Sequence, residues 1–252
     1  PLTQFLGPWI LQKDTTINNQ LTFEKKVINQ LLDQLPSYSN FLQSCNYDFQ
    51  NGLPFIWKGF TQSTGYTYVI EDTSDISLIW NNMKGSLRTD IKNSKEKHNL
   101  SIEGNGDIDV FISLYQAVFT RQKRKPPFDT QLLRNLYKNC LKRNAGKLLI
   151  AKDLNGNSHA AVLLVWDDTT VYYLASGSDP ELRKSQALSF LLWEAIQIAS
   201  EQKKKFNFEG SMVESIERHF RSFGAEQFSY PAFSKSNSKL VSLLLHIRSY
   251  LN

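Results

Sequence analysis

The segment 148–176, LLIAKDLNGNSHAAVLLVWDDTTVYYLAS, decides the fold of this chain. It holds three runs of aliphatic, β-branched and aromatic residues that predict strands at Leu148–Lys152, Ala160–Trp166 and Thr170–Ser176. The turn 153–157 joins the first pair and Asp167-Asp168 joins the second. Strands joined by such short turns form an antiparallel meander.

A strand–helix–strand unit follows this meander. Residues 188–198 are apolar on most faces and predict a buried helix, which Ser178-Asp179-Pro180-Glu181 would begin as a capping box. Phe206–Glu209 predicts a short strand after it. A second capping box, 211–214, would begin a helix that ends at Gly224. Such a unit brings a parallel pair into an otherwise antiparallel sheet.

In the rest of the chain, the spacing of apolar residues and the positions of helix-breaking residues predict further helices and strands. Other predicted helices are 21–35 (stopped by Pro36), 75–83, the basic helix 86–97, a helix capped by Asp107 or Asp109 that runs through Phe119, a helix from Asp129 to near Gly146, and the closing helix 239–251. Other predicted strands are 67–70 and 227–230.

Four stretches carry a resemblance to a known family. They are FLLWEAI at 190–196, FNFEGS at 206–211, IERHFRSFG at 216–224 and the basic LRTDIKNSK at 87–95. Together with the element order, they resemble the FemAB-like branch of the GNAT acyltransferase superfamily. The resemblance implies an α+β fold with a GNAT-like mixed, mostly antiparallel sheet flanked by helices. It also implies that residues 84–252 form an acyltransferase domain and that residues 1–83 are the remainder of a first GNAT-like half.

The same resemblance implies a reaction. The chain would move an acyl or aminoacyl group from acyl-CoA or aminoacyl-tRNA, used as a co-substrate, to an amine of a cell-envelope or polysaccharide precursor. One departure concerns the donor: the stretch before the central helix, 181–187, contains no glycine. A backbone cradle for phosphates needs glycine for close approach, so side chains would have to bind the phosphates instead.

Composition excludes several other classes of protein. The formal net charge of +5 is mild, and no apolar run reaches the roughly 20 residues of a membrane helix. Two cysteines and four scattered histidines give neither a disulfide framework nor metal-ligand spacing. We therefore expect reduced thiols, no metal, no tightly bound cofactor and a cytoplasmic location, with a small molecule or a precursor as substrate.

Two residues are candidates for catalysis, because the strands ending near Ser176 and at Glu209 would diverge and open a cleft. Glu209 would accept the proton of the attacking amine, or it is a surface or capping carboxylate. Tyr173 would donate a proton to the leaving group, or it is a half-buried tyrosine of the sheet. Tyr172 and Tyr173 point to opposite faces, so only one of them can face the cleft.

Binding candidates lie around these strand ends and on the basic part of the chain. The donor-binding candidates are Arg183, Lys184, Ser176 and Ser211, the last of which also suits a plain N-cap. Arg88, Lys92 and Lys95 follow helical spacing and, with Arg124, would hold an anionic substrate such as tRNA phosphates. The alternative is a solvated charged face.

Two other functions remain open from the sequence. The basic residues between 84 and 147 fit an RNA-binding protein, although most aromatic residues fall in core positions instead of beside the basic ones. The glycine-free turn fits a GNAT-shaped scaffold that has lost catalysis.

Overall fold

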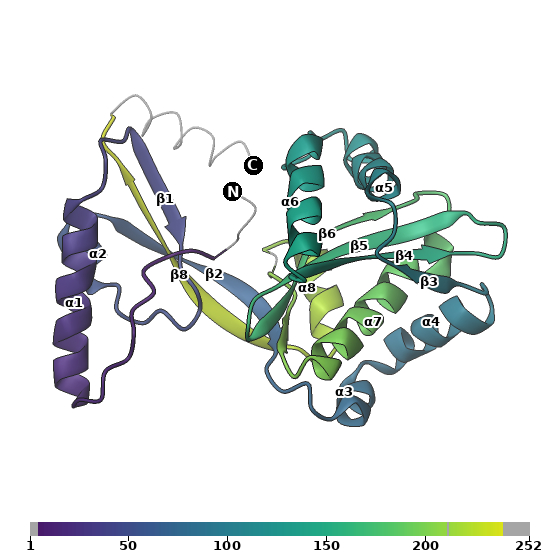
Figure 1. Ribbon diagram of the computed structural model, residues 1–252, viewed down its shortest axis with the longest axis horizontal. Coiled ribbons are helices and arrows are strands. Elements are labelled where there is room, and N and C mark those ends of the chain that lie inside the picture. The colour runs from purple at the N-terminus through teal and green to yellow at the C-terminus, as the bar shows by residue number, and fades with distance from the viewer. Residues whose placement is uncertain (1–4, 211, 239–252) are drawn as a thin grey trace. The chain divides into compact units, whose positions relative to one another are not determined.

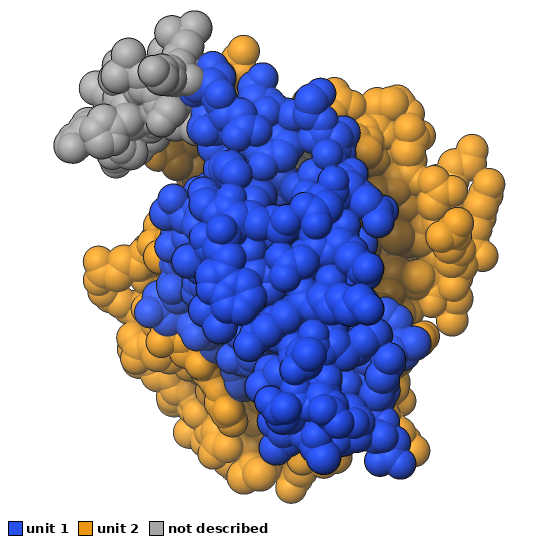
Figure 2. Space-filling model, turned by 90° about the vertical axis from the view of Figure 1, so that its left-hand side faces the viewer, with its two compact units in different colours: residues 1, 3–66, 228–252 blue, residues 2, 67–227 orange. Residues whose placement is uncertain are grey.

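The computed structural model describes residues 5–210 and 212–238. Contacts group these residues into two compact units, which Figure 2 distinguishes: unit 1 holds residues 5–66 and 228–238, and unit 2 holds residues 67–210 and 212–227. The predicted domains 1–83 and 84–252 were based on the two GNAT-like halves that the resemblance implies, and this division stays a prediction. By contacts, residues 67–83 belong to unit 2 and residues 228–238 to unit 1.

Unit 1 combines strands from both ends of the chain with two helices. Its elements are α1 (Ile17–Asp33), β1 (Asn40–Ser44), α2 (Leu53–Trp57), the first part of β2 (Thr61–Ile70) and most of β8 (Glu226–Ser236). β1 runs antiparallel to β8, and the rings of Phe55 and Phe233 stack 4.1 Å apart in the core. The predicted helix 21–35 corresponds to α1, which begins one turn earlier because Thr16 caps it.

Unit 2 carries the predicted meander and the strand–helix–strand unit. Its helices are α3 (Ile76–Asn82), α4 (Gly85–Glu96), α5 (Ile108–Arg121), α6 (Thr130–Lys142), α7 (Ala187–Glu201), α8 (Glu214–Arg221) and the short 3₁₀ turn Arg183–Ser185. Its strands are the end of β2, β3 (Ser101–Gly104), β4 (Gly146–Lys152), β5 (Ser158–Trp166), β6 (Thr170–Ser178) and β7 (Lys205–Asn207).

The strands of unit 2 lie side by side in the order β2-β7-β6-β5-β4-β3. Neighbours are antiparallel except β6 and β7, which are parallel. The predicted α+β class, with a mixed and mostly antiparallel sheet flanked by helices, is therefore confirmed.

Helices cover both faces of this sheet (Figure 1). Successive residues of a strand point to opposite faces, so β4 sends Leu149 to one core and Leu148 and Ile150 to the other. The first core includes residues of α4, α7 and α8, and the second includes residues of α5 and α6. The continuous burial of β4 and β5 follows from this double cover.

The predicted start of the central helix is wrong. Ser178 is the last residue of β6, and the Asp179 side chain accepts a hydrogen bond from the Glu181 N–H at 2.8 Å. This contact makes an Asx turn instead of a helix cap. The 3₁₀ turn and Gln186, with φ of +55°, follow, and α7 begins only at Ala187.

Two further predictions fall outside the described residues. They are the capping and donor-binding roles of Ser211 and the closing helix 239–251. α8 begins at Glu214, with Val213 at the N-cap position, two residues later than the capping box at 211–214 predicts, and it ends at Arg221, three residues before Gly224.

Candidate active site

The parallel strands of unit 2 separate where the sequence predicted a cleft. Paired residues of β6 and β7 run from Thr170–Lys205 to Tyr172–Asn207, after which β7 ends while β6 continues to Ser178. β6 also carries a bulge: Leu163 of β5 faces Ala175 and Leu164 faces Tyr173, so Leu174 is the extra residue. A bulge leaves backbone groups outside the ladder and bends the strand.

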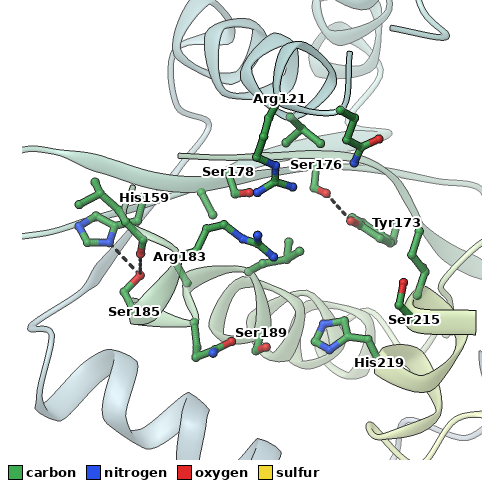
Figure 3. A pocket seen from close by; sticks show the side chains of 18 of the residues that line it. Arg121, His159, Tyr173, Ser176, Ser178, Arg183, Ser185, Ser189, Ser215 and His219 are labelled. Carbon is green, nitrogen blue, oxygen red and sulfur yellow. Dashed lines mark hydrogen bonds between the residues drawn. The ribbon is translucent and has the colours of Figure 1, made fainter. Parts of the chain in front are cut away.

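A pocket of about 870 Å³ opens beside this separated part of β6. Side chains from α5, β5, β6, the loop 182–186, the first turn of α7, and α8 line it (Figure 3). Its volume falls in the range of small-molecule sites. The end of β6, the start of β5, a helix start and two further helices therefore meet around one cavity within unit 2.

One side of the pocket is cationic. Arg121 at the end of α5, Arg124 just beyond it and Arg183 in the 3₁₀ turn all line the cavity, and all three are exposed. Among the lining residues that the structure describes there is no Asp or Glu. Guanidinium groups stay charged and bind phosphate oxygens in pairs. This side of the pocket therefore suits an anionic ligand.

The start of α7 adds to this electrostatic character. Gln186 takes the left-handed conformation at the N-cap position and makes no side-chain capping hydrogen bond. The first N–H groups of a helix have no partner within it, and the helix dipole is positive at this end. Because Gln186, Ala187 and Ser189 line the pocket, these donors lie on the same side as the arginines.

Tyr173 and Ser176 of β6 also line the pocket, and their hydroxyl groups share a hydrogen bond (Figure 3). The Tyr173 ring packs edge-on against Phe220, with centroids 5.9 Å apart. Burial raises the pKa of Tyr173 to about 12, so its hydroxyl keeps its proton at neutral pH. Tyr173 is therefore the tyrosine that faces the cavity.

Tyr172 has a different environment. Its hydroxyl donates to Asp167 Oδ2 at 2.9 Å, and it does not line the pocket. Burial and the neighbouring Asp167 charge raise its pKa. The sequence left the choice between the two tyrosines open, and the pocket lining now places Tyr173 at the cavity.

Glu209 follows β7 in the left-handed conformation, with φ of +57°, and its N–H donates to Asn207 Oδ1 at 2.7 Å. It is half-buried and does not line the pocket, while its charge contributes to raising the pKa of Tyr172. Burial raises the pKa of Glu209 to about 8. The structure thus does not place Glu209 in the cavity with Tyr173, and its catalytic role stays a prediction.

The raised pKa of Glu209 gives a testable dependence of stability on pH. Between its ordinary pKa of 4.5 and about 8, the folded carboxyl holds a proton that the unfolded one releases. Its contribution to stability is therefore greatest below pH 4.5 and is lost as the pH rises to 8. We expect Glu209→Gln to match the wild-type melting temperature near pH 4.5 and to exceed it at pH 8 and above. The exposed Glu201→Gln is the matched control, and equal pH profiles for both variants would contradict the prediction.

The predicted basic residues do not form one surface. Lys92 and Lys95 of α4 line a separate groove of about 500 Å³ with Trp80 and Trp193, whereas Arg124 lines the main pocket. The Arg88 guanidinium donates to the Asn81 carbonyl at 3.4 Å and lines neither cavity. Lys184 is exposed and also lies outside the pocket lining.

His219 is a pocket residue that the sequence analysis missed. Its Nε2 is buried without a hydrogen-bond partner, and burial lowers its pKa. The ring lies 5.3 Å from that of Phe223, and the residue lines the cavity from α8 (Figure 3). A signal was present, because His219 follows Ile216 by three positions and precedes Phe223 by four, which places all three on one helical face.

Residues 5–210 and 212–238 contain no group of three or more His, Cys, Asp or Glu side chains that could hold a metal ion. None of the helices formed by them is long and apolar enough to cross a membrane. Cys45 and Cys140 form no disulfide.

Comparison with known proteins identifies the class that this fold and pocket define. A family model described as an acetyltransferase (GNAT) domain matches residues 81–208, which is half of the chain. The chain therefore belongs to the GNAT acetyltransferase domain family, and the expected resemblance is confirmed. No curated protein matches it.

Several solved structures share the fold at low sequence identity. FemX is 12% identical with a TM-score of 0.64, over 85% of this chain and 76% of that chain. L-PGS from Bacillus licheniformis is 11% identical with a TM-score of 0.59, over 92% and 78%. The C-terminal domain of a putative lysylphosphatidylglycerol synthetase from Agrobacterium fabrum is 11% identical with a TM-score of 0.58, over 79% and 69%. The FemAB-like branch is thus represented among structures with this fold.

Proposed function

We propose that this chain is an N-acyltransferase that takes an acyl or aminoacyl group from a phosphate-bearing donor, acyl-CoA or aminoacyl-tRNA, and transfers it to an amine. The observation that carries the proposal is the meeting of Arg121, Arg124 and Arg183 with the start of α7, beside the separated end of β6. Membership of the GNAT family supports acyl transfer as the reaction class.

Arginine side chains take over phosphate binding in this proposal. The loop 181–187 has no glycine that would bring the backbone close to a pyrophosphate, whereas Arg183 in the same loop lines the pocket. A guanidinium group binds two phosphate oxygens at once and needs no close backbone approach. This arrangement suits the phosphates of CoA and those of tRNA equally well.

The reacting carbonyl would lie beside β6. Backbone groups at the bulge near Leu174 are outside the ladder with β5, and β7 has ended, so an N–H group there can polarise the carbonyl oxygen. The acceptor nitrogen attacks the carbonyl carbon, and the bond to the donor sulfur or oxygen breaks. Tyr173 gives its hydroxyl proton to that leaving atom.

The acceptor amine must lose a proton in the same reaction. We assign this proton to Glu209, which follows β7 where its pairing with β6 ends. Because Glu209 lies outside the pocket lining, the proton would pass to it through a water molecule. The acceptor would be an amine of a cell-envelope or polysaccharide precursor, and the folds shared with FemX and a putative lysylphosphatidylglycerol synthetase support the aminoacyl form of the reaction.

Donor binding can be tested by thermal stabilisation with acetyl-CoA, a longer acyl-CoA and aminoacyl-tRNA in parallel. At 100 times Kd a ligand stabilises by about 2.7 kcal/mol. For a chain of this size that corresponds to a rise in melting temperature of roughly 5–10 °C. We expect a rise with one donor class. Arg121→Ala and Arg183→Ala should reduce it, while Arg143→Ala, an exposed arginine outside the pocket, should not.

Each outcome discriminates between the functions considered. A rise with a CoA ester favours an N-acyltransferase that uses CoA, and a rise with aminoacyl-tRNA alone favours aminoacyl transfer. Stabilisation by uncharged tRNA to the same extent as by charged tRNA would favour plain RNA binding. No rise with any of these ligands would contradict the proposal and favour a scaffold.

A further inference from the structure

A buried chain of hydrogen bonds includes two residues that line the pocket, His159 and Ser185, beside Arg183. His159, near the start of β5, places its Nδ1 2.8 Å from Ser185 Oγ and its Nε2 3.3 Å from Asp153 Oδ2. The Ser94 hydroxyl of α4 lies 2.7 Å from the Ser185 carbonyl and 2.9 Å from the Asp90 carbonyl and shares its one proton between them. His159, Ser185 and Ser94 are 7%, 2% and 0% exposed. Figure 3 shows His159 and Ser185 beside Arg183.

The Asp153 end of this chain is rigid. Asp153 Oδ1 accepts hydrogen bonds from the N–H groups of Asn155 and Asn157, each at 2.9 Å, and Oδ2 accepts one from the Asn157 side chain at 2.9 Å. These contacts lower the pKa of Asp153 to about 2, so the carboxylate stays ionised at neutral pH. His159 therefore connects a fixed turn to the loop before α7.

Within the loop, the backbone hydrogen bonds are those of one tight turn, from the Ser185 N–H to the Leu182 carbonyl and from the Gln186 N–H to the Arg183 carbonyl, each at 3.1 Å. Its 3₁₀ turn spans only Arg183–Ser185, and the next residue, Gln186, holds a left-handed conformation without a capping side chain. A non-glycine residue in that conformation persists when its surroundings impose it. Ser185 is the position at which hydrogen bonds from β5 and α4 both reach the loop.

We propose that His159 is a positioning residue of the donor site, which through Ser185 fixes the loop 182–186 and thereby holds Arg183 and the start of α7 against the donor phosphates. This inference rests on the proposed function, because it assumes an anionic donor in the pocket. It adds Asp153, His159, Ser185 and Ser94 to the residues on which donor binding depends.

Asp, His and Ser are also the residue types of a nucleophilic triad, and the geometry argues against that role here. The Ser185 hydroxyl lies 2.8 Å from the Leu182 carbonyl, to which it donates, and the residue is almost fully buried. A hydroxyl has one proton, so when it is donated to Leu182 the serine can only accept from His159. The contact then supports the loop and does not activate the serine.

Two isosteric replacements of His159 separate its two contacts. The amide of asparagine lies near the position of Nδ1, and the amide of glutamine lies near that of Nε2. His159→Asn therefore keeps the contact to Ser185, and His159→Gln keeps only the contact to Asp153. We expect His159→Asn to bind the donor within about threefold of wild type, and His159→Gln and Ser185→Ala to bind it at least about tenfold more weakly, in line with the loss of one buried hydrogen bond.

The experiment measures Kd for acetyl-CoA and for aminoacyl-tRNA by calorimetry, with turnover as a second readout. A positioning role predicts a raised KM for the donor in His159→Gln with kcat unchanged, after melting curves have shown that each variant is folded. Equal donor affinities for His159→Asn and His159→Gln would overturn the proposal. So would covalent labelling of Ser185 by a fluorophosphonate, because that would make the serine a nucleophile.

Failure of the proposed function would be recognised separately. If the wild-type protein binds neither acetyl-CoA nor aminoacyl-tRNA, the donor proposal fails, and hydrogen exchange of the amides in 182–187 then tests the support of the loop by itself. Faster exchange in His159→Gln than in His159→Asn is the expected result. Identical exchange in the two variants would overturn the positioning role.

Discussion

Tyr173→Phe is expected to lower kcat by about 10²- to 10⁴-fold, the usual range for losing a general acid. The ring keeps its edge contact with Phe220, so the change removes only the hydroxyl that lies beside Ser176 in the pocket. Donor affinity should remain within about threefold of wild type, because the change removes no arginine and no N–H group at the start of α7. Release of CoA from acetyl-CoA, or of uncharged tRNA from aminoacyl-tRNA, with a panel of amine acceptors measures the effect.

Tyr172→Phe is the matched control for this experiment. It removes a hydroxyl that donates to Asp167 outside the pocket, so it should leave kcat within about threefold of wild type. Full turnover by Tyr173→Phe would rule out the proton-donor role. An equal loss in both variants would indicate a general effect of removing a strand hydroxyl.

Gly177→Ala is expected to destabilise unit 2 by about 1–3 kcal/mol, the usual cost of overpacking. A Cβ on Gly177 would overlap the backbone of Leu114 and Tyr115, because α5 packs directly on β6 at this point. The melting temperature should fall by roughly 2–4 °C for each kcal/mol. Because α5 carries Arg121 into the pocket, donor binding should weaken as well.

Gly85→Ala is the matched glycine replacement. Gly85 opens α4, and a Cβ there would meet only the tip of Arg88 at 3.9 Å. It should leave stability unchanged or raise it by up to about 1 kcal/mol, since alanine favours a helix over glycine. A wild-type melting temperature for Gly177→Ala would contradict the close packing of α5 on β6.

The sheet and most helices were predictable because their signals are local. The runs at 148–152 and 160–166 are short, apolar and bounded by turn residues. This pattern indicates buried strands. Asp129 caps α6 as the sequence predicted, and Asp107, one of its two candidates, caps α5. The parallel pair followed from chain order alone, since a helix long enough for a crossover separates β6 from β7.

The loop before α7 shows where local reading fails. Ser178-Asp179-Pro180-Glu181 suits a helix cap and an Asx turn equally well, and contacts distant in sequence decide between them. Ser94 and His159 hold Ser185 from 91 and 26 residues away. No pattern within the loop records those partners, so the delayed start of α7 could not be predicted.

The candidate site was predictable in part for the same reason. Tyr173, Ser176 and Arg183 line one pocket, because a strand end and a helix start fix their positions. Arg124 lines the same pocket, although it was predicted to act together with Arg88, Lys92 and Lys95. The direction of Glu209 depends on its left-handed backbone, which nothing in the local sequence requires. Lys92 and Lys95 have the predicted helical spacing, but the packing of α4 places them in the separate groove that Trp80 and Trp193 also line.

The composition of unit 1 from residues 5–66 and 228–238 has a consequence for synthesis on the ribosome. Residues 5–66 are translated before residues 67–227, yet β1 lacks its antiparallel partner β8 until residues 226–236 have been translated. Unit 2 is continuous from residue 67 and can fold as soon as residue 227 leaves the exit tunnel. Until residue 236 has been added, β1 has no partner along the edge that β8 covers, and an unpaired strand edge is a template for aggregation.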